Sequence, residues 1–223
     1  MLLNIPNVLT PEEVVAVKQR LQQAKFVDGK LSAGSAAQRV KHNEEVDVHS
    51  ADVEQLNSLV MGKLVQNPVY SAAALPMRVA APYYARYTTG MSYGDHVDDP
   101  IMHAQGPYRS DISITVFLSD EKDYDGGELV INTQYGEHSV KLPAGHAVMY
   151  PSSSVHHVNE VTSGERLVAV TWLQSLVREP AKRELLYDMY LVKEGLLKKA
   201  PDAEDTKRLD RSYVNLIRMW GDV

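Results

Sequence analysis

The stretch Arg166-Leu-Val-Ala-Val-Thr-Trp-Leu173 decides the fold that this sequence predicts, because its apolar and β-branched residues favour a strand. Between Met77 and Leu176, similar short runs are separated by Gly, Pro, Asp and Ser. They lie at residues 78–87, 110–118, 128–133, 137–142, 147–150 and 155–161. This spacing predicts an all-β sandwich or jelly roll rather than alternating strands and helices. We expect turns at residues 125–127, 142–145 and 162–164.

Helices are predicted on both sides of this β-rich tract. A short strand within residues 1–9 precedes Thr10-Pro11-Glu12-Glu13, where Thr10 and Glu13 form a capping box for a helix that runs to about Ala24. A second helix is expected from Ser50 or Ala51 to Val65, ended by Asn67-Pro68. Two tail helices, separated by Pro201, carry apolar stripes that we expect to pack on the barrel. The predicted parts are residues 1–76, 77–176 and 177–223.

The composition excludes several classes of function but does not identify the function itself. The chain has 223 residues and a formal charge of -6, with no long Lys/Arg run, so a nucleic-acid partner is not expected. It has no cysteine, which excludes disulfides, thiolate metal ligands and thiol nucleophiles. No apolar run approaches the roughly 18 residues of a membrane span. We expect a cytoplasmic protein with no membrane contact.

The segment His96-Val-Asp98 precedes the main β tract and offers two metal ligands. In an extended segment, residues two apart share a face, so both side chains can reach one ion. Two histidines and one carboxylate are typical of Fe(II) sites that activate oxygen, since they leave coordination positions open. A third ligand has to come from a distant strand. Of the later histidines, only His156 has an arginine ten residues on, Arg166, although periodicity alone does not choose between His156 and His157.

Arg166 needs an anionic partner if it points into a barrel, because an unpaired buried charge is unfavourable. A dicarboxylate cosubstrate fits this requirement. One end would chelate the iron through a keto acid group, and the far carboxylate would take a bidentate pair from the guanidinium.

Four parts of the chain resemble a known family. They are Arg86-Tyr87-Thr-Thr-Gly90-Met-Ser-Tyr93-Gly-Asp-His96-Val-Asp98, Tyr124-Asp-Gly-Gly-Glu-Leu129, Tyr150-Pro-Ser-Ser-Ser-Val-His156, and Arg166 with Trp172. Together they resemble the prolyl/lysyl hydroxylase branch of the Fe(II)/2-oxoglutarate dioxygenases. Within it they are similar to the bacterial PKHD-type hydroxylases, a group described as iron-uptake factor PiuC. The resemblance spans nearly the whole chain and is strongest over residues 78–175.

The resemblance implies a double-stranded β-helix in which His96, Asp98 and His156 bind Fe(II) and Arg166 anchors 2-oxoglutarate. It also implies O2 as a substrate, L-ascorbate as reductant, and Tyr87 in the cosubstrate pocket. Some relatives use a tyrosine where Phe117 stands here. A hydroxyl from Ser113 or Thr115 could replace it, because these residues share a strand face with Phe117.

Other functions stay open on the sequence alone. The same three ligands could serve a cupin-like metal enzyme or zinc hydrolase, and a non-catalytic jelly-roll module could bind a metal or ligand. The primary substrate, a small molecule, siderophore or peptidyl residue, is not specified. We expect residues 31–46 and 97–108 to flank the mouth of the site. The apolar tail helices could form a homodimer contact.

Overall fold

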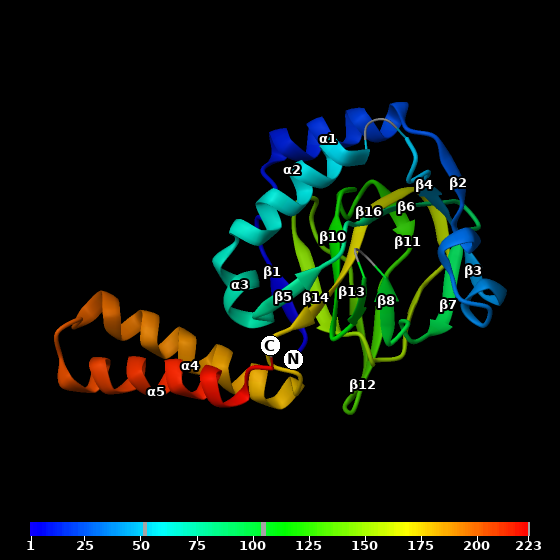
Figure 1. The fold of residues 1–223 in the computed structure, drawn as a ribbon. Helices are drawn as coiled ribbons and strands as arrows, with labels where there is room; N and C mark the ends of the chain where they lie inside the picture. Colours follow the sequence, from blue (N-terminus) through cyan, green and yellow to red (C-terminus); the bar gives the residue numbers. More distant parts are fainter. Residues whose placement is uncertain (51–52, 104–105, 223) are drawn as a thin grey trace.

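The computed structural model describes residues 1–50, 53–103 and 106–222, and its core is a pair of antiparallel β-sheets (Figure 1). The larger sheet has the order β1 (Leu3–Ile5), β14 (Ala147–Pro151), β10 (Ile112–Phe117), β16 (Val161–Ser175), β6 (Tyr83–Thr88), β4 (Glu44–Val46) and β2 (Phe26–Asp28), with β11 (Tyr124–Gly126) and β5 (Pro76–Val79) also paired to β16. The smaller sheet has the order β13 (Gly136–Val140), β12 (Leu129–Thr133), β15 (His156–Val158), β7 (Ser92–His96) and β3 (Lys41–His42). Strands β8 (Ile101–His103) and β9 (Pro107–Arg109) form a separate pair. The predicted jelly roll with flanking helices is confirmed.

Strand β16 organises the larger sheet because it pairs with β10, β6, β11 and β5. It is longer than predicted and includes residues 162–164, where the sequence analysis expected a turn. That expectation is wrong, since Tyr124 on β11 pairs with Gly164. Gly164 lies within the strand but has a positive φ of 78°, so the backbone is locally irregular there. A Cβ on residue 164 would lie 2.1 Å from Asp123 O. The close approach of this neighbouring segment therefore also requires glycine at position 164.

Alternate residues of β16 face two different cores. Leu167, Ala169 and Leu173 pack with the helices that cover the larger sheet, whereas Val168 packs between the two sheets. The inward set also includes Arg166, which is almost fully buried. Strand β10 is likewise buried along its whole length. The continuous apolar runs in the sequence therefore reflect strands that are covered on both faces.

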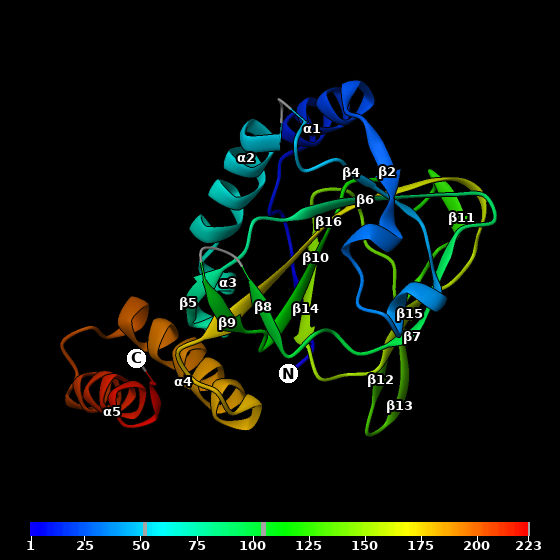
Figure 2. The ribbon, with the colours of Figure 1, turned by 45° about the vertical axis from the view of Figure 1, so that its right-hand side comes forward.

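The N-terminal helices cover the outer face of the larger sheet (Figures 1 and 2). Helix α1 (Pro11–Gln23) has the predicted capping box, in which Thr10 accepts from Glu13 N and the Glu13 side chain accepts from Thr10 N. Helix α2 (Val53–Gln66) follows. The predicted start at Ala51 lies outside the described residues.

Two local features differ from the sequence prediction. Asn67-Pro68 ends α2 but also begins α3 (Pro68–Ala74), because the Asn67 side chain accepts from Val69 N and Tyr70 N. The predicted strand over residues 78–87 divides into β5 and β6 around Pro82. Proline cannot donate a ladder hydrogen bond, which accounts for the interruption.

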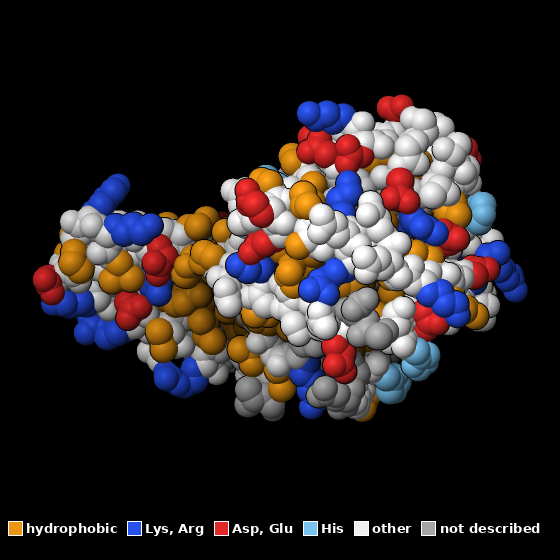
Figure 3. Space-filling model, turned by 90° about the horizontal axis from the view of Figure 1, so that it is seen from above, with side chains coloured by type: hydrophobic (Ala, Val, Ile, Leu, Met, Phe, Trp, Pro, Cys, Tyr) orange, Lys and Arg blue, Asp and Glu red, His pale blue; other side chains and the backbone are white. Residues whose placement is uncertain are grey.

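The tail forms a helical hairpin of α4 (Pro180–Lys199) and α5 (Glu204–Trp220) that extends away from the sheets (Figure 1). Its apolar stripes pack mainly between the two helices, around Leu186 and Tyr213, and reach Leu75 and Val177 at the base. The expectation that they pack on the barrel was therefore wrong for most of their length. Figure 3 shows hydrophobic side chains gathered along the hairpin and charges of both signs mixed over the β-domain. No helix in the described part of the chain is long and apolar enough to cross a membrane.

Replacing the cap residue tests how the first helix is fixed. We expect Thr10→Ala to lower the free energy of unfolding by about 1 kcal/mol, because Glu13 N loses its acceptor. Urea unfolding followed by circular dichroism measures the change. Thr89→Ala, at an exposed position without a cap, is the control, and equal stability of the two variants would contradict a contribution from the cap.

Candidate metal and cosubstrate site

A cavity of about 580 Å³ lies between the two sheets and is lined by both of them. Residues from both predicted flanking loops line it, among them Lys41 and Asn43 from residues 31–46 and Met102 and Tyr108 from residues 97–108. Both segments thus contribute to the cavity wall, and both carry short strands, β3 and β4 in the first and β8 and β9 in the second. The cavity joins the side chains of the three candidate metal ligands to that of Arg166 on the opposite sheet.

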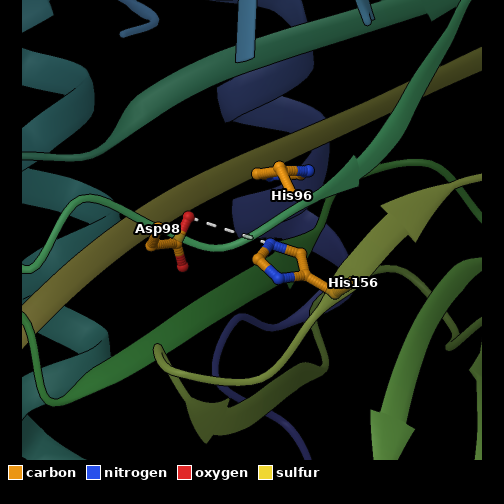
Figure 4. A group of neighbouring side chains, drawn as sticks. All are labelled: His96, Asp98 and His156. Carbon is orange, nitrogen blue, oxygen red and sulfur yellow. Dashed lines mark ion pairs between the residues drawn. The ribbon is translucent and has the colours of Figure 1, made fainter. Parts of the chain in front are cut away.

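His96, Asp98 and His156 line this cavity, and their side chains lie close together (Figure 4). His96 ends β7 and His156 begins β15, and the two residues are direct partners in the antiparallel pairing of these strands. Asp98 follows β7 by two residues. Each residue offers one ligand atom, and the three atoms all lie within 4.8 Å of one another. The backbone register therefore brings together two segments that are some 60 residues apart in the sequence.

The adjacent histidine, His157, points away from this group. Its Nδ1 lies 2.8 Å from Asp95 Oδ1 and its Nε2 lies 3.1 Å from Asn159 Oδ1, in an exposed set of contacts. His156, in contrast, is 4% exposed. The structure thus resolves the choice that strand periodicity left open: His156 faces the cavity and His157 faces outward.

Backbone carbonyls fix the orientation of both inward histidines. His96 Nδ1 lies 2.8 Å from Gly94 O, and His156 Nδ1 lies 3.0 Å from Ser154 O. A carbonyl can only accept, so each Nδ1 carries a proton and each Nε2 is the nitrogen left to face a metal. His96 also stacks on Tyr93, with ring centroids 3.6 Å apart. Both rings are thus held in an orientation that suits metal binding through Nε2.

Asp98 is oriented by a serine from the opposite sheet. Ser113 Oγ donates to Asp98 Oδ2 and lies 2.8 Å from Ser152 Oγ, while Asp98 Oδ1 lies 3.8 Å from His156 Nε2. One carboxylate oxygen is thereby held by the protein and the other faces the histidines. The strand pattern offered Ser113 or Thr115 as a hydroxyl for the far carboxylate of the cosubstrate, since no local signal places Ser113 beside Asp98.

Burial keeps the His96 imidazole neutral. Loss of solvent, together with the nearby His156, lowers the pKa of His96 to about 4. At neutral pH the ring is therefore unprotonated, as metal binding requires.

Arg166 is buried deep in the cavity wall at 2% exposure. Its guanidinium carbon lies 4.9 Å from the Tyr87 ring centre and 5.7 Å from the Phe117 ring centre. Among the described residues no carboxylate forms an ion pair with it, and its Nε has no hydrogen-bond partner. Desolvating a cation in this way is unfavourable unless an anion binds there. The arginine thus fits a carboxylate ligand.

Tyr87 lies beside Arg166 because the two residues are cross-strand partners on β6 and β16. Burial raises the pKa of Tyr87 to about 12, with Arg166 acting in the opposite direction. The hydroxyl therefore remains protonated and can donate to an anion. Thr115 also lines the cavity, as does Tyr150, a buried tyrosine that sequence analysis did not assign.

A glycine supports the position of Arg166. Gly127 has a φ of 65°, and a Cβ there would lie 3.2 Å from Arg166 Cδ and 2.8 Å from Val161 Cγ2. The turn expected at residues 125–127 is not formed as predicted, since Asp125 and Gly126 belong to β11, with an irregular register between them. Gly127 follows the strand and packs against the arginine stem.

Comparison with known proteins agrees with this geometry. Residues 82–174 match the model of the 2OG-Fe(II) oxygenase superfamily. A PKHD-type hydroxylase of Thioalkalivibrio sulfidiphilus is 52% identical to this chain, and one of Paracoccus denitrificans is 44% identical. Both alignments cover the whole of each protein.

Among solved structures, a viral collagen prolyl hydroxylase from Paramecium Bursaria Chlorella virus-1, in its 2OG complex, is similar with a TM-score of 0.56 and 15% sequence identity. The match covers 78% of this chain and 96% of that chain. At this level of identity the likeness concerns the fold.

The lowered pKa of His96 predicts a pH-dependent stability of the metal-free protein. The unfolded chain binds a proton near pH 6.5 that the folded chain binds only near pH 4, so stability falls as pH decreases through this window. We expect the loss between about pH 7 and about pH 5 to be smaller in His96→Gln than in the wild type. Urea unfolding at both pH values measures it, and His42→Gln, at an exposed histidine, is the control. An identical loss in wild type and His96→Gln would contradict the prediction.

Proposed function

From the premise that this chain belongs to the PKHD-type hydroxylases of the 2OG-Fe(II) oxygenase superfamily, we propose that His96, Asp98 and His156 hold Fe(II) and that Arg166 anchors 2-oxoglutarate. The protein is an Fe(II)- and 2-oxoglutarate-dependent dioxygenase that hydroxylates its substrate. The single observation that carries the residue assignment is the meeting of the three ligand atoms within 4.8 Å in the same cavity as a buried arginine.

The donor set fits ferrous iron. Two imidazole nitrogens and one carboxylate oxygen form the set used by non-haem Fe(II) oxygenases, which leave positions open for cosubstrate and oxygen. The Nε2 atoms of the two histidines and Asp98 Oδ1, which faces them, are the atoms that would bind. Because the chain has no cysteine, no thiolate competes for the metal.

The cavity also fits a dicarboxylate. The guanidinium of Arg166 lacks an acidic partner in the described residues, and a carboxylate would satisfy both its charge and its hydrogen-bond donors. We propose that Tyr87 and Thr115 add hydroxyl contacts to 2-oxoglutarate, supported by their place beside Arg166 and on the cavity wall. Ser113 is not proposed for this role, because its hydroxyl is engaged with Asp98.

The iron and 2-oxoglutarate, when bound, supply the oxidation: one atom of O2 enters succinate as CO2 leaves, and the other enters a C–H bond of the substrate. The protein's residues supply position and environment. Gly94 O and Ser154 O hold the imidazoles, Ser113 holds the carboxylate, and the packed aromatic wall formed by Tyr93, Tyr150 and Trp172 limits water near the metal. No side chain has to transfer a proton as a general acid or base.

Several finer assignments are part of the same proposal. L-Ascorbate would keep the iron ferrous, on the strength of the relation to the PKHD-type group. The substrate is a small molecule, such as a siderophore, or a peptidyl residue. The proposal also links the reaction to iron uptake. A cytoplasmic location is supported by the acidic, cysteine-free composition. Exposed apolar residues on the tail hairpin, such as Leu191 and Val192, support a homodimer contact.

Removing the arginine tests the cosubstrate assignment. We expect Arg166→Ala to weaken 2-oxoglutarate binding on the order of 100-fold or more, because the far carboxylate loses its charged partner. Binding of Mn(II), measured separately by calorimetry, should be retained. Arg86→Ala is the matched control, since Arg86 lies on β6 and pairs with Glu44 outside the cavity. Unchanged 2-oxoglutarate affinity in Arg166→Ala would overturn the assignment.

Removing the serine hydroxyl tests how the carboxylate ligand is held. We expect Ser113→Ala to weaken Mn(II) binding about 10- to 100-fold, because Asp98 loses the partner that orients it. Calorimetric titration gives the affinity, and Ser139→Ala on the exposed strand β13 is the control. If metal affinity were the same in both variants, Ser113 would have no part in positioning Asp98.

A further inference from the structure

The side chain of His96 rests on an aromatic ring that also contacts a buried lysine from the N-terminal part of the chain. The imidazole stacks on Tyr93, with ring centroids 3.6 Å apart and ring planes inclined by 12°. Lys41 is 6% exposed, and its Nζ lies 5.2 Å from the centre of the same tyrosine ring, within the range of a cation–π contact. The Tyr93 ring therefore packs against both a candidate metal ligand and an ammonium group.

The strand register brings Lys41 to this ring. Lys41 and Tyr93 are direct partners in the antiparallel pairing of β3 with β7. Beside them, Gly94 N donates to Val40 O at 2.9 Å, and Gly94 O accepts from His96 Nδ1 at 2.8 Å. Residues 40 and 41 are therefore linked to His96 by two routes, one through the backbone of Gly94 and one through the side chain of Tyr93.

Two hydrogen-bond acceptors fix the ammonium group of Lys41. Its Nζ lies 2.5 Å from Glu45 Oε1 and donates to Ser32 Oγ at 2.9 Å. The side chains of the ion pair are only 7% and 10% exposed, so water does little to screen their attraction. An exposed lysine moves freely on its four-carbon stem, whereas these contacts hold Lys41 Nζ beside the Tyr93 ring.

The ion pair of Lys41 and Glu45 lies where the chain crosses between the two sheets. Lys41 is on β3, which pairs with β7 of the smaller sheet, and Glu45 is on β4, which pairs with β6 of the larger sheet. Both residues line the cavity, and both lie outside residues 82–174, which match the superfamily. A buried ion pair adds little net stability compared with an apolar pair of similar size. Its place beside the ring that supports His96 points to a role in the metal site.

We propose that Lys41, held by Glu45 and Ser32, is a positioning residue that fixes the Tyr93 ring and, through this ring, orients the His96 imidazole for metal binding. This inference rests on the proposed function, in which His96 binds Fe(II). Lys41 acts on the metal site through Tyr93 and is not itself a ligand. The proposal gives the N-terminal part of the chain a role in metal binding, because β3 supplies the group that holds the ring.

The test titrates the full chain with two metal probes in the absence of turnover. Calorimetry gives the affinity for Mn(II), and the visible spectrum of bound Co(II) reports the geometry of its ligands. We expect Lys41→Met, which keeps most of the stem but removes the ammonium group, to weaken Mn(II) binding on the order of tenfold and to alter the Co(II) spectrum. Glu45→Gln should change both readouts in the same direction, because the ammonium group loses its charged partner.

A double-mutant cycle tests whether Lys41 acts through the ring. Tyr93→Leu should also weaken Mn(II) binding, and adding Lys41→Met to it should cause little further loss, because the ring that transmits the effect is already absent. Lys25→Met is the matched control: Lys25 is an exposed lysine that pairs with Asp47 outside the cavity, so this variant should bind Mn(II) as the wild type does. Circular dichroism checks that each variant is folded, and Glu45→Gln carries the test if Lys41→Met does not fold.

The outcomes separate this inference from the proposed function. If the wild type binds Mn(II) no more tightly than His96→Ala does, the proposed function fails. If Mn(II) binding depends on His96 but folded Lys41→Met and Glu45→Gln bind the metal as tightly as the wild type, only this inference is overturned. It is also overturned if the losses caused by Lys41→Met and Tyr93→Leu add in full, since Lys41 would then not act through the ring.

Discussion

The packing around the cavity depends on accommodating the buried guanidinium of Arg166. The side chain is 2% exposed, lies between two aromatic rings and has no acidic partner in the described part of the chain. A charge in this position is tolerated when a ligand carboxylate completes the pair. The residues that hold it there, Gly127 against its stem and Tyr87 across the strand, therefore contribute to a binding site as well as to the core.

The two sheets contribute different residues to the site. The smaller sheet supplies the histidines through the pairing of β7 with β15, whereas the larger sheet supplies Arg166, Tyr87 and the serine that holds Asp98. The proposed metal ligands and the proposed cosubstrate anchor thus come from different sheets, and the packing between these sheets sets the distance between them. This explains why a jelly roll suits the reaction: both groups lie on regular strands, whose positions are more rigid than those of loops.

The cavity wall offers two kinds of contact. Charged and protonated groups around Arg166 suit a dicarboxylate, whereas two imidazoles and a carboxylate suit a metal. The contacts differ because each kind of ligand requires a different pattern of donors and acceptors. Residues from the segments 31–46 and 97–108 also line this wall.

The sequence by itself determined the features that depend on neighbouring residues. The capping box of α1, most strands of the jelly roll and the shared face of His96 and Asp98 follow from local spacing, because capping and alternation act over two to four residues. The assignment of His156 and Arg166 was sharpened by the resemblance to a family. Only the tertiary structure decided that His156 faces inward and His157 outward, that Ser113 holds Asp98, and that Lys41 lies beside Tyr93. Each of these depends on the register and packing of strands distant in the sequence, and no local pattern records that pairing.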